Sequence, residues 1–271
     1  MSIETIVDAA VEIADAGGLS SVSMSSVAAS LGFTPMSLYR YISAKDDLIL
    51  LMQERGIGVP PESLLEIEGW REGMRAWAAE SLRSFVEHPW LLDIPISGTP
   101  ITPNNLAWLD AALTALESTP LEYADKISVV LGVMAQTRWE GIVSRGYTDA
   151  AASSGTSTDD LDVQSAELLA GLITEAEFPQ VRRALEAGVF SPDANDPFSF
   201  GLERYLDGIA AYLDGRGSIP VARPDSIPDE VARDTKVREA VKARRETEKL
   251  LREARKRERQ AVQAAAERMS R

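Results

Sequence analysis

The sequence contains no cysteine and a single histidine, His88, among its 271 residues. Without thiols the chain can form no disulfide and no thiolate metal site, and we interpret this as the composition of a cytoplasmic protein. One histidine and no glycine-rich phosphate loop leave no recognisable catalytic site, so the sequence predicts no catalytic residue, no metal and no cofactor. Because His88 precedes Pro89 at the end of a predicted helix, a structural capping role is the simpler interpretation.

Long hydrophobic runs are also missing, since no stretch approaches the roughly 20 apolar residues that span a bilayer. The first turns of the chain carry Glu4, Asp8 and Glu12 among apolar residues, where a signal peptide would be basic and then uncharged. We therefore expect a soluble protein without a membrane partner.

Basic residues are scarce, with 28 Lys and Arg against 42 Asp and Glu, for a net charge of −14. Because cations bind the phosphates of DNA, this total argues against a nucleic-acid partner. The distribution changes that interpretation. Residues 229–271 carry 14 basic and 9 acidic side chains, whereas residues 1–228 carry 14 basic and 33 acidic ones. Any DNA contact made by the acidic body must depend on a few placed residues.

Apolar residues recur at spacings of three and four along several stretches, which is the pattern of amphipathic helices. These stretches cover residues 3–14, 70–86, 106–116 and 198–213, and no period-two alternation competes with them. The sequence therefore predicts an all-α protein. Clusters of Gly, Pro and small polar residues predict breaks at residues 56–61, 94–105, 147–160, 191–197 and 214–228.

Residues 23–48 predict a helix-turn-helix followed by a third helix. Ser23 can cap a short helix over residues 24–31, and Gly32 can take the positive φ of a tight turn. Thr34 can cap a second helix that has Pro35 at its first position, and a third helix begins after Ser43. The residues predicted to pack between these helices are Val27, Ala28, Leu31, Phe33, Leu38, Leu48, Ile49, Leu51 and Met52.

The stretches 23–24, 27–41 and 45–48 closely resemble the TetR family of repressors. The stretches 70–75 and 88–90 are similar to the sensor domain of the branch that contains the tetracycline repressor. The resemblance implies a homodimer that binds a palindromic DNA operator and releases it when a small molecule enters each sensor domain. We predict a helix-turn-helix DNA-binding domain at residues 1–58, a helical effector-binding and dimerisation domain at 59–228, and a long basic helix at 229–271.

Side chains near the N-terminal end of the second helix of such a motif reach base edges in the major groove. We predict that Met36, Ser37 and Arg40 read bases, while the hydroxyls of Tyr39 and Tyr41 bond to phosphate. The alternative is that Met36 and Tyr41 are partly core. The complete predicted DNA-binding set is Ser23, Ser25, Thr34, Pro35, Met36, Ser37, Tyr39, Arg40, Tyr41 and Lys45.

Two features depart from the family pattern. Many relatives have an arginine where this chain has Ser25, and a basic arm ahead of the first helix, which here starts almost at Met1. Residues 1–58 hold only Arg40, Lys45 and Arg55 against seven carboxylates. A protein-binding adaptor that has lost specific DNA binding is therefore an alternative hypothesis, and an enzyme is a weaker one.

All five tryptophans lie between residues 70 and 139, where a large apolar pocket can use them. Aromatic residues at helical spacing are more often core, so plain packing is the competing interpretation. A tetracycline-like magnesium complex is not expected, because such sites in the family use more than one histidine. For a largely apolar effector, the predicted pocket comprises Trp70, Met74, Trp77, Trp108, Met134, Arg138 and Trp139, with Gln136 and Glu140 as further polar groups.

The stretch 127–134 has almost no polar side, as in a helix buried between a pocket and a partner. Together with the helix at 198–213 it predicts a four-helix dimer bundle. The alternative is that both helices complete a monomeric core. The predicted interface residues are Ile127, Leu131, Leu202, Leu206, Ile209 and Leu213. For the basic helix at 229–271 we consider two roles, a solvated appendage or a source of the phosphate-binding cations that residues 1–58 lack.

Overall fold

The computed structural model describes residues 1–96, 102–174, 176–189, 196–215 and 234–239, together with residues 242 and 246. The chain divides into two compact units, Met1–Gly217 and Ser218–Arg271. In the second unit residues 235–239 are helical, and most of the long helix predicted over 229–271 lies outside the described residues. Every described element of the first unit is a helix, which confirms the all-α class.

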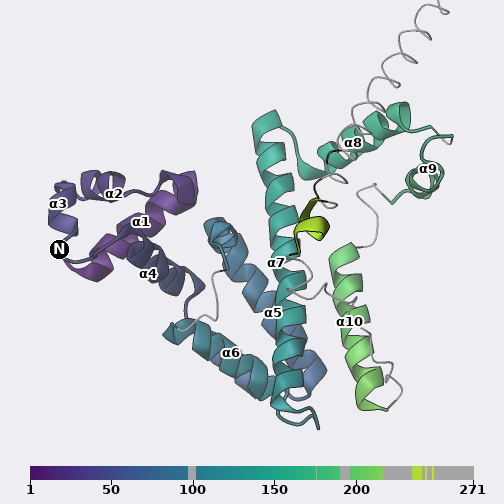
Figure 1. Ribbon diagram of the computed structural model, residues 1–271, viewed down its shortest axis with the longest axis horizontal. Coiled ribbons are helices and arrows are strands. Elements are labelled where there is room, and N and C mark those ends of the chain that lie inside the picture. The colour runs from purple at the N-terminus through teal and green to yellow at the C-terminus, as the bar shows by residue number, and fades with distance from the viewer. Residues whose placement is uncertain are drawn as a thin grey trace, which may run out of the picture. The chain divides into compact units, whose positions relative to one another are not determined.

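Four α-helices form a group at the N-terminus (Figure 1): α1 (Ile3–Gly17), α2 (Met24–Ser30), α3 (Pro35–Leu38) and α4 (Lys45–Ile57), with the 3-10 helix η1 (Leu19–Ser21) after α1. We call this group the reading head, after the DNA-binding role that the sequence predicts for it. Ile6, Val27, Leu38 and Met52 lie at its centre and are fully buried. The same core also takes in Trp90, from much later in the chain, so the packing does not stop at the end of α4.

The rest of the first unit comprises η2 (Glu62–Glu66), α5 (Trp70–Glu87), η3 (Pro89–Asp93), α6 (Pro103–Ala115), α7 (Tyr123–Ser154), α8 (Thr158–Leu172), α9 (Pro179–Glu186) and α10 (Pro197–Leu213). Helices α5, α6, α7 and α10 share a second core around buried Met74, Trp77, Leu116, Val133 and Leu206. Figure 1 shows α10 running alongside α7. We call this part the sensor domain.

Helix α7 continues through residues 147–154, where the sequence predicted a break. The alanines at 150–152 favour helix, and they outweigh the small polar residues around them. The helix ends at Gly155, whose φ of +68° is left-handed, and the Thr156 N–H closes the end on the Ala151 carbonyl at 3.1 Å. Ser157 and Asp160 then form a capping box for α8, so the break is only three residues long.

A network of charged side chains ties α10 to α5. The Arg71 guanidinium donates to Glu203 Oε2 at 2.9 Å and to Asp207, and the Arg75 guanidinium donates to the same Glu203 oxygen at 2.6 Å. These two guanidinium groups hold the pKa of Glu203 at about 2, and Arg71 and Arg204 also lower the pKa of Asp207. The charges therefore fix the register between the two helices.

This network makes the stability of the fold depend on pH. The pKa of Glu203 is depressed in the folded chain, so its ion pairs stabilise the fold fully above its ordinary pKa of 4.5. That contribution is lost as the pH falls from about 4.5 toward about 2. Because the Glu203 side chain is 30% exposed, solvent screening limits the contribution to about 1 kcal/mol. We expect Glu203→Gln to lower the thermal midpoint at pH 7 by about 2–4 °C and to flatten its decline in acid.

Thermal unfolding followed by circular dichroism between pH 7 and pH 2 measures both effects. Glu80→Gln is the matched control, because Glu80 is also 30% exposed but pairs only with Arg83 on its own helix. An acid decline of the same steepness in wild type and Glu203→Gln would show that the network adds nothing to stability.

Candidate functional site

The predicted helix-turn-helix is present, and its first helix is capped as expected. The Ser26 N–H donates to Ser23 Oγ at 3.0 Å, and the Ser23 N–H donates to Ser26 Oγ at 2.8 Å, which completes a capping box. The Ser23 hydroxyl also donates to Ser26 Oγ, so its hydrogen atom is used within the fold. Gly32 takes a φ of +74°, as the turn requires. Ser25 is exposed and remains free to face a ligand.

The second helix of the motif is only four residues long. Helix α3 ends at Leu38, and residues 39–41 continue as a turn in which the Tyr41 N–H donates to the Leu38 carbonyl at 2.8 Å. The predicted side-chain cap by Thr34 is wrong, since its hydroxyl lies 3.0 Å from the Ser37 hydroxyl and makes no cap bond. Pro35 does occupy the first helical position.

Of the three residues predicted to read bases, Met36 and Arg40 are exposed on the surface of the head, whereas Ser37 is half-buried. Met36 is 73% exposed, and Tyr39, Arg40 and Tyr41 are also exposed. The alternative that Met36 is partly core is therefore wrong, whereas Tyr41, at 42% exposed, still buries more than half of its surface. Two expectations about packing are also wrong, because Phe33 and Leu51, both predicted to pack between the helices, are exposed. Leu38, fully buried, is the side chain that anchors α3 under this surface.

The few cations of the head are concentrated at this surface. Arg55 Nε lies 2.9 Å from Asp8 Oδ1, so its charge is already paired. Arg40 and Lys45 are the two cations of residues 1–58 for which the structure shows no ion pair. Arg40 follows α3 and Lys45 begins α4, so the unpaired positive charge of the head lies on the surface that the sequence predicts to contact DNA.

Helices α4 and α6 are joined by direct hydrogen bonds. The Asn104 N–H, in the first turn of α6, donates to Glu54 Oε1 at 2.7 Å, and the Asn104 side chain donates to the Glu54 carbonyl at 2.8 Å. One turn further on, the Trp108 indole donates to the Gly58 carbonyl at 3.1 Å. The last helix of the head thus caps the first turn of α6 with a carboxylate, a favourable arrangement at a helix N-terminus.

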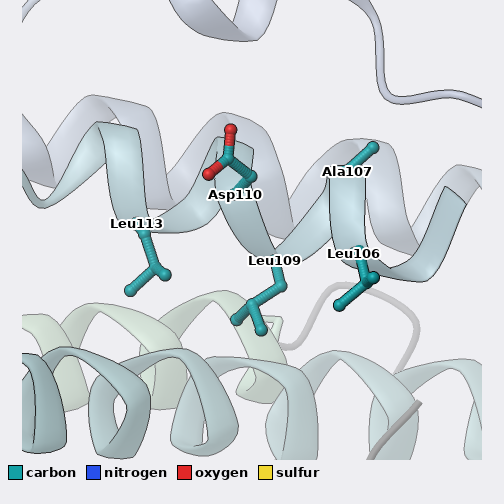
Figure 2. Close-up of a pocket in the computed structure, with 5 residues that line it drawn as sticks. All are labelled: Leu106, Ala107, Leu109, Asp110 and Leu113. Atoms are coloured by element: carbon teal, nitrogen blue, oxygen red, sulfur yellow. The ribbon is translucent and has the colours of Figure 1, made fainter. Parts of the chain in front are cut away.

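An open groove of about 400 Å³ runs along α6, lined by Leu106, Ala107, Leu109, Asp110 and Leu113. Figure 2 shows the three leucines projecting to one side of the helix and Asp110 to the other. Leu106 is 46% exposed at the rim. The groove is therefore predominantly apolar, with one carboxylate at its edge, and it lies on the same helix that Glu54 caps.

None of the seven residues predicted to line a pocket lies in this groove. Met74, Trp77 and Trp108 are buried core, with the two indole rings edge to face at 6.1 Å and the Trp77 N–H donating to the Trp108 carbonyl at 2.9 Å. Trp70 and Met134 pack half-buried against that core. The leucine spacing of 106–113 predicts an amphipathic helix, but spacing alone does not distinguish a groove-lining face from a face packed on the core.

The polar residues predicted for the pocket have other positions. Arg138 donates to the backbone carbonyls of Leu92, in η3, and of Ile94, just after it. Trp139 is 60% exposed on α7. Gln136 Nε2 donates weakly to the Gly201 carbonyl at 3.5 Å, whereas its Oε1 is buried without a partner. Burial raises the pKa of the Glu140 carboxyl, and the nearby charge of Asp196 adds to that shift.

The stripe of α10 predicted to contact a second protomer faces the chain's own core. Leu206 is fully buried there, so its predicted place on the interface is wrong. Leu202, Ile209 and Leu213 pack half-buried against the same core, and Ile127 is half-buried. Leu131 alone among the six predicted residues is exposed, at 64%.

A different, outward stripe is left uncovered on the two helices. On α10 it follows the i, i+4 row of Phe200, Arg204, Gly208 and Tyr212, all exposed. On α7 the corresponding row is Leu131, Ala135 and Trp139. We call these seven residues the outward stripe. Helices α7 and α10 pack together where the Tyr205 ring crosses Gly132, a position where a Cβ would overlap the tyrosine oxygen.

Within the described residues, no group of three His, Asp or Glu side chains is placed to hold a metal ion. In the same ranges, no helix has both the length and the hydropathy needed to cross a membrane.

Comparison with known proteins gives a family match for the reading head and another for the sensor domain. Residues 6–52 match the model for bacterial regulatory proteins of the tetR family, and residues 64–213 match the tetracyclin repressor-like C-terminal domain. The HTH-type transcriptional repressor DrrR1 of Streptomyces coeruleorubidus is 35% identical, covering 79% of this chain and 78% of its own length. The repressor Rv1353c of Mycobacterium tuberculosis is 25% identical over 83% of this chain and 88% of its own.

Solved structures share the fold. ActR from Streptomyces coelicolor, in complex with actinorhodin, superposes with a TM-score of 0.64 at 23% identity, covering 78% of this chain and 96% of that one. A possible TetR family transcriptional regulator from the same organism gives a TM-score of 0.60 at 21% identity, covering 78% of this chain and all of that one.

Proposed function

The chain belongs to the TetR family of transcriptional regulators, and we propose that it is a homodimeric repressor that holds a palindromic operator until a largely apolar small molecule binds beside α6. The observation that carries this proposal is the position of α6. That helix lines the groove and is hydrogen-bonded to the last helix of the reading head through Asn104 and Trp108. Occupancy of the groove can therefore reach the DNA-binding surface through a single rigid element.

Base reading is assigned to the exposed surface around α3. Met36 and Arg40 project from the surface that Leu38 anchors, and Arg40 can donate two hydrogen bonds to a guanine edge in the major groove. Tyr39, Tyr41 and Lys45 can contact phosphates on either side, and Ser25 is exposed close to them in sequence. With two unpaired cations in each head, the affinity depends strongly on having two heads bound at once.

Dimer formation is assigned to the outward stripe rather than to the stripe predicted from sequence. Phe200 and Tyr212 on α10, with Leu131 and Trp139 on α7, are at least half exposed in one chain. Gly208 has open space where a side chain would stand, so a second backbone can approach α10 closely there. Two such helices from each protomer make a four-helix bundle whose two-fold symmetry matches a palindromic operator.

The effector acts by preferring one spacing of the two heads. A ligand with equal affinity for the operator-bound and free conformations would shift nothing, so the groove must differ between them. A shift of α6 pulls on Glu54 and Gly58 and rotates α4 with it. A coupling of about 1–3 kcal/mol between effector and operator, or about 5–150-fold in affinity, is the range expected for such a device.

A mobility-shift assay on DNA from upstream of the chain's own coding region tests the proposal. We expect a salt-dependent complex that a random fragment of equal length does not compete away. Actinorhodin, the ligand of the ActR complex, is a first candidate effector to add. If no DNA from the chain's own locus is bound above the random fragment, the repressor function is wrong, and an adaptor role becomes the better hypothesis.

Filling the groove is expected to separate effector binding from DNA binding. Leu106→Trp places a large ring at the exposed rim, away from the hydrogen bonds at Asn104 and Trp108. We expect effector affinity to fall about tenfold or more, equivalent to about 1.4 kcal/mol, with operator affinity changed less than about twofold. Titration of actinorhodin, the first candidate effector, into the operator complex measures both quantities.

Leu65→Trp is the control, because Leu65 is similarly exposed, at 58%, but lies on η2 outside the groove. Equal effector affinity in wild type and Leu106→Trp would place the effector elsewhere in the sensor domain.

A further inference from the structure

The short helix η3 lies between α7 and the reading head, and α7 holds it through backbone carbonyls. The Arg138 guanidinium donates to the Leu92 carbonyl at 2.6 Å and to the Ile94 carbonyl at 3.0 Å. About two turns further along α7, Arg145 donates to the Pro89 carbonyl and pairs with the Asp93 carboxylate, both at 2.8 Å. The beginning and the end of η3 are therefore both fixed to the same helix.

The free-energy cost of partly burying the Arg138 charge points to a role in positioning η3. Its guanidinium is partly buried and bonded only to neutral carbonyls, and this burial lowers the pKa of Arg138. A partly buried cation without a carboxylate in bonding distance contributes little net stability, because desolvation offsets the attraction. The two bonds instead fix the orientation of η3 relative to α7, because the planar guanidinium holds two carbonyls at once.

On its other side η3 is inserted into the reading head by Trp90. This side chain is 1% exposed and belongs to the core of the head. Its indole N–H donates to Asp15 Oδ1 on α1 at 2.6 Å, and His88 Nδ1 lies 2.8 Å from the same oxygen. The ring also presses on α4, where a Cβ at Gly56 would lie 2.9 Å from Trp90 Cη2. Trp90 thus contacts the two longest helices of the head.

We infer that η3 is a second mechanical link between the sensor domain and the reading head, with Asp15, Trp90 and Arg138 as positioning residues that set the orientation of the head. This inference rests on the proposed repressor function, but it is independent of the α6 link. The α6 link holds the C-terminal end of α4 through Glu54 and Gly58. The η3 link holds α1, and α4 from the side of Gly56. Two separated attachments prevent the head from swivelling about either one.

A head that can swivel loses discrimination between half-site spacings, which a mere loss of stability would leave unchanged. In a two-headed helix-turn-helix dimer, the spacing of the half-sites on the DNA matches the spacing of the reading helices. The wild-type dimer should therefore bind its operator more tightly than an operator with one base pair inserted at the centre. The ratio of these two affinities reports how rigidly the heads are held.

Two single variants of the full chain test the link. Trp90→Phe removes the indole N–H and keeps an aromatic ring in the head core. Asp15→Ala removes the acceptor and does not weaken α1, because an acid near a helix C-terminus is unfavourable and alanine is the best helix former. In each variant we expect the affinity ratio between the two operators to fall about fivefold or more. Because both changes remove the bond between Trp90 and Asp15, the fall in the double variant should be smaller than the two single effects combined, although Asp15→Ala also removes the contact with His88 Nδ1.

Ser81→Ala is the control, since it deletes a buried hydrogen bond of 2.8 Å, to the Trp77 carbonyl, that lies wholly within α5. Its operator ratio should equal that of wild type. If Trp90→Phe does not fold, Asp15→Ala carries the test alone. A wild-type ratio in the η3 variants, or an equal fall in Ser81→Ala, would overturn the link. Failure of wild type to bind any operator would instead overturn the repressor function.

Discussion

The paired substitution Leu131→Glu and Phe200→Glu is expected to leave folded monomers that no longer bind the operator. Both side chains lie on the outward stripe, and both are more than 60% exposed in a single chain, so neither change disturbs the sensor core. In a dimer, four carboxylates would be buried in the interface, where Arg204 is the one cation of the outward stripe and already pairs with Asp207, and this burial costs several kcal/mol. A monomer presents one reading head, and the loss of simultaneous binding lowers operator affinity by about 10²–10⁴-fold. Sedimentation velocity and the mobility-shift assay measure the two effects.

Leu168→Glu and Ile209→Glu are the informative comparisons. Leu168 is equally exposed, at 64%, but lies on α8, so the change should leave the dimer intact. Ile209 packs against the chain's own core, and a carboxylate there should lower the thermal midpoint instead of producing a folded monomer. If the paired variant sediments with the wild-type mass, the outward stripe is not the interface.

The contrast between Ile209 and Phe200 shows where sequence reasoning ends. The regular spacing of Leu202, Leu206 and Ile209 correctly predicted a helix with an apolar face. Spacing cannot tell whether that face covers the chain's own core or a second protomer, because both bury the same kind of surface. Which face of α10 is covered depends on α5, because Arg71 and Arg75 of that helix bond to Glu203 and fix how α10 is oriented. Contacts between residues that are more than 100 positions apart leave no mark on a local pattern.

The helix-turn-helix was predictable in more detail because its signals are local. Ser23, Gly32 and Pro35 each act within a few residues of their own position, through a cap, a positive φ and a first helical turn. The pocket was not predictable in this way. Trp77 and Trp108 satisfy their indole N–H groups on carbonyls of distant segments, which makes them core and leaves the groove to leucines. Only the packing of α6 distinguishes the two roles.

Arg40→Ala is expected to remove sequence discrimination from the reading head without unfolding it. Arg40 is exposed, lies just beyond α3 and has no ion pair in the reading head, so its loss leaves no buried group unsatisfied. A good guanidinium contact to a guanine edge contributes about 1–3 kcal/mol, and a symmetric dimer makes it twice. The ratio of operator to random-DNA affinity should therefore fall by about 30-fold or more.

Lys45→Ala separates this role from simple charge loss, because it also removes one cation per head from the same surface. Lys45 begins α4 beside Asp46 and Asp47, where it can meet a phosphate but is not on the base-reading turn. Its loss should weaken operator and random DNA alike and reduce the salt dependence of binding, by about 0.9 in the slope of log affinity against log salt per lost contact. Fluorescence anisotropy with both DNAs at several salt concentrations distinguishes the variants. If Arg40→Ala keeps the wild-type ratio while Lys45→Ala loses it, the two assignments must be exchanged, with the base contact beginning at α4 rather than after α3.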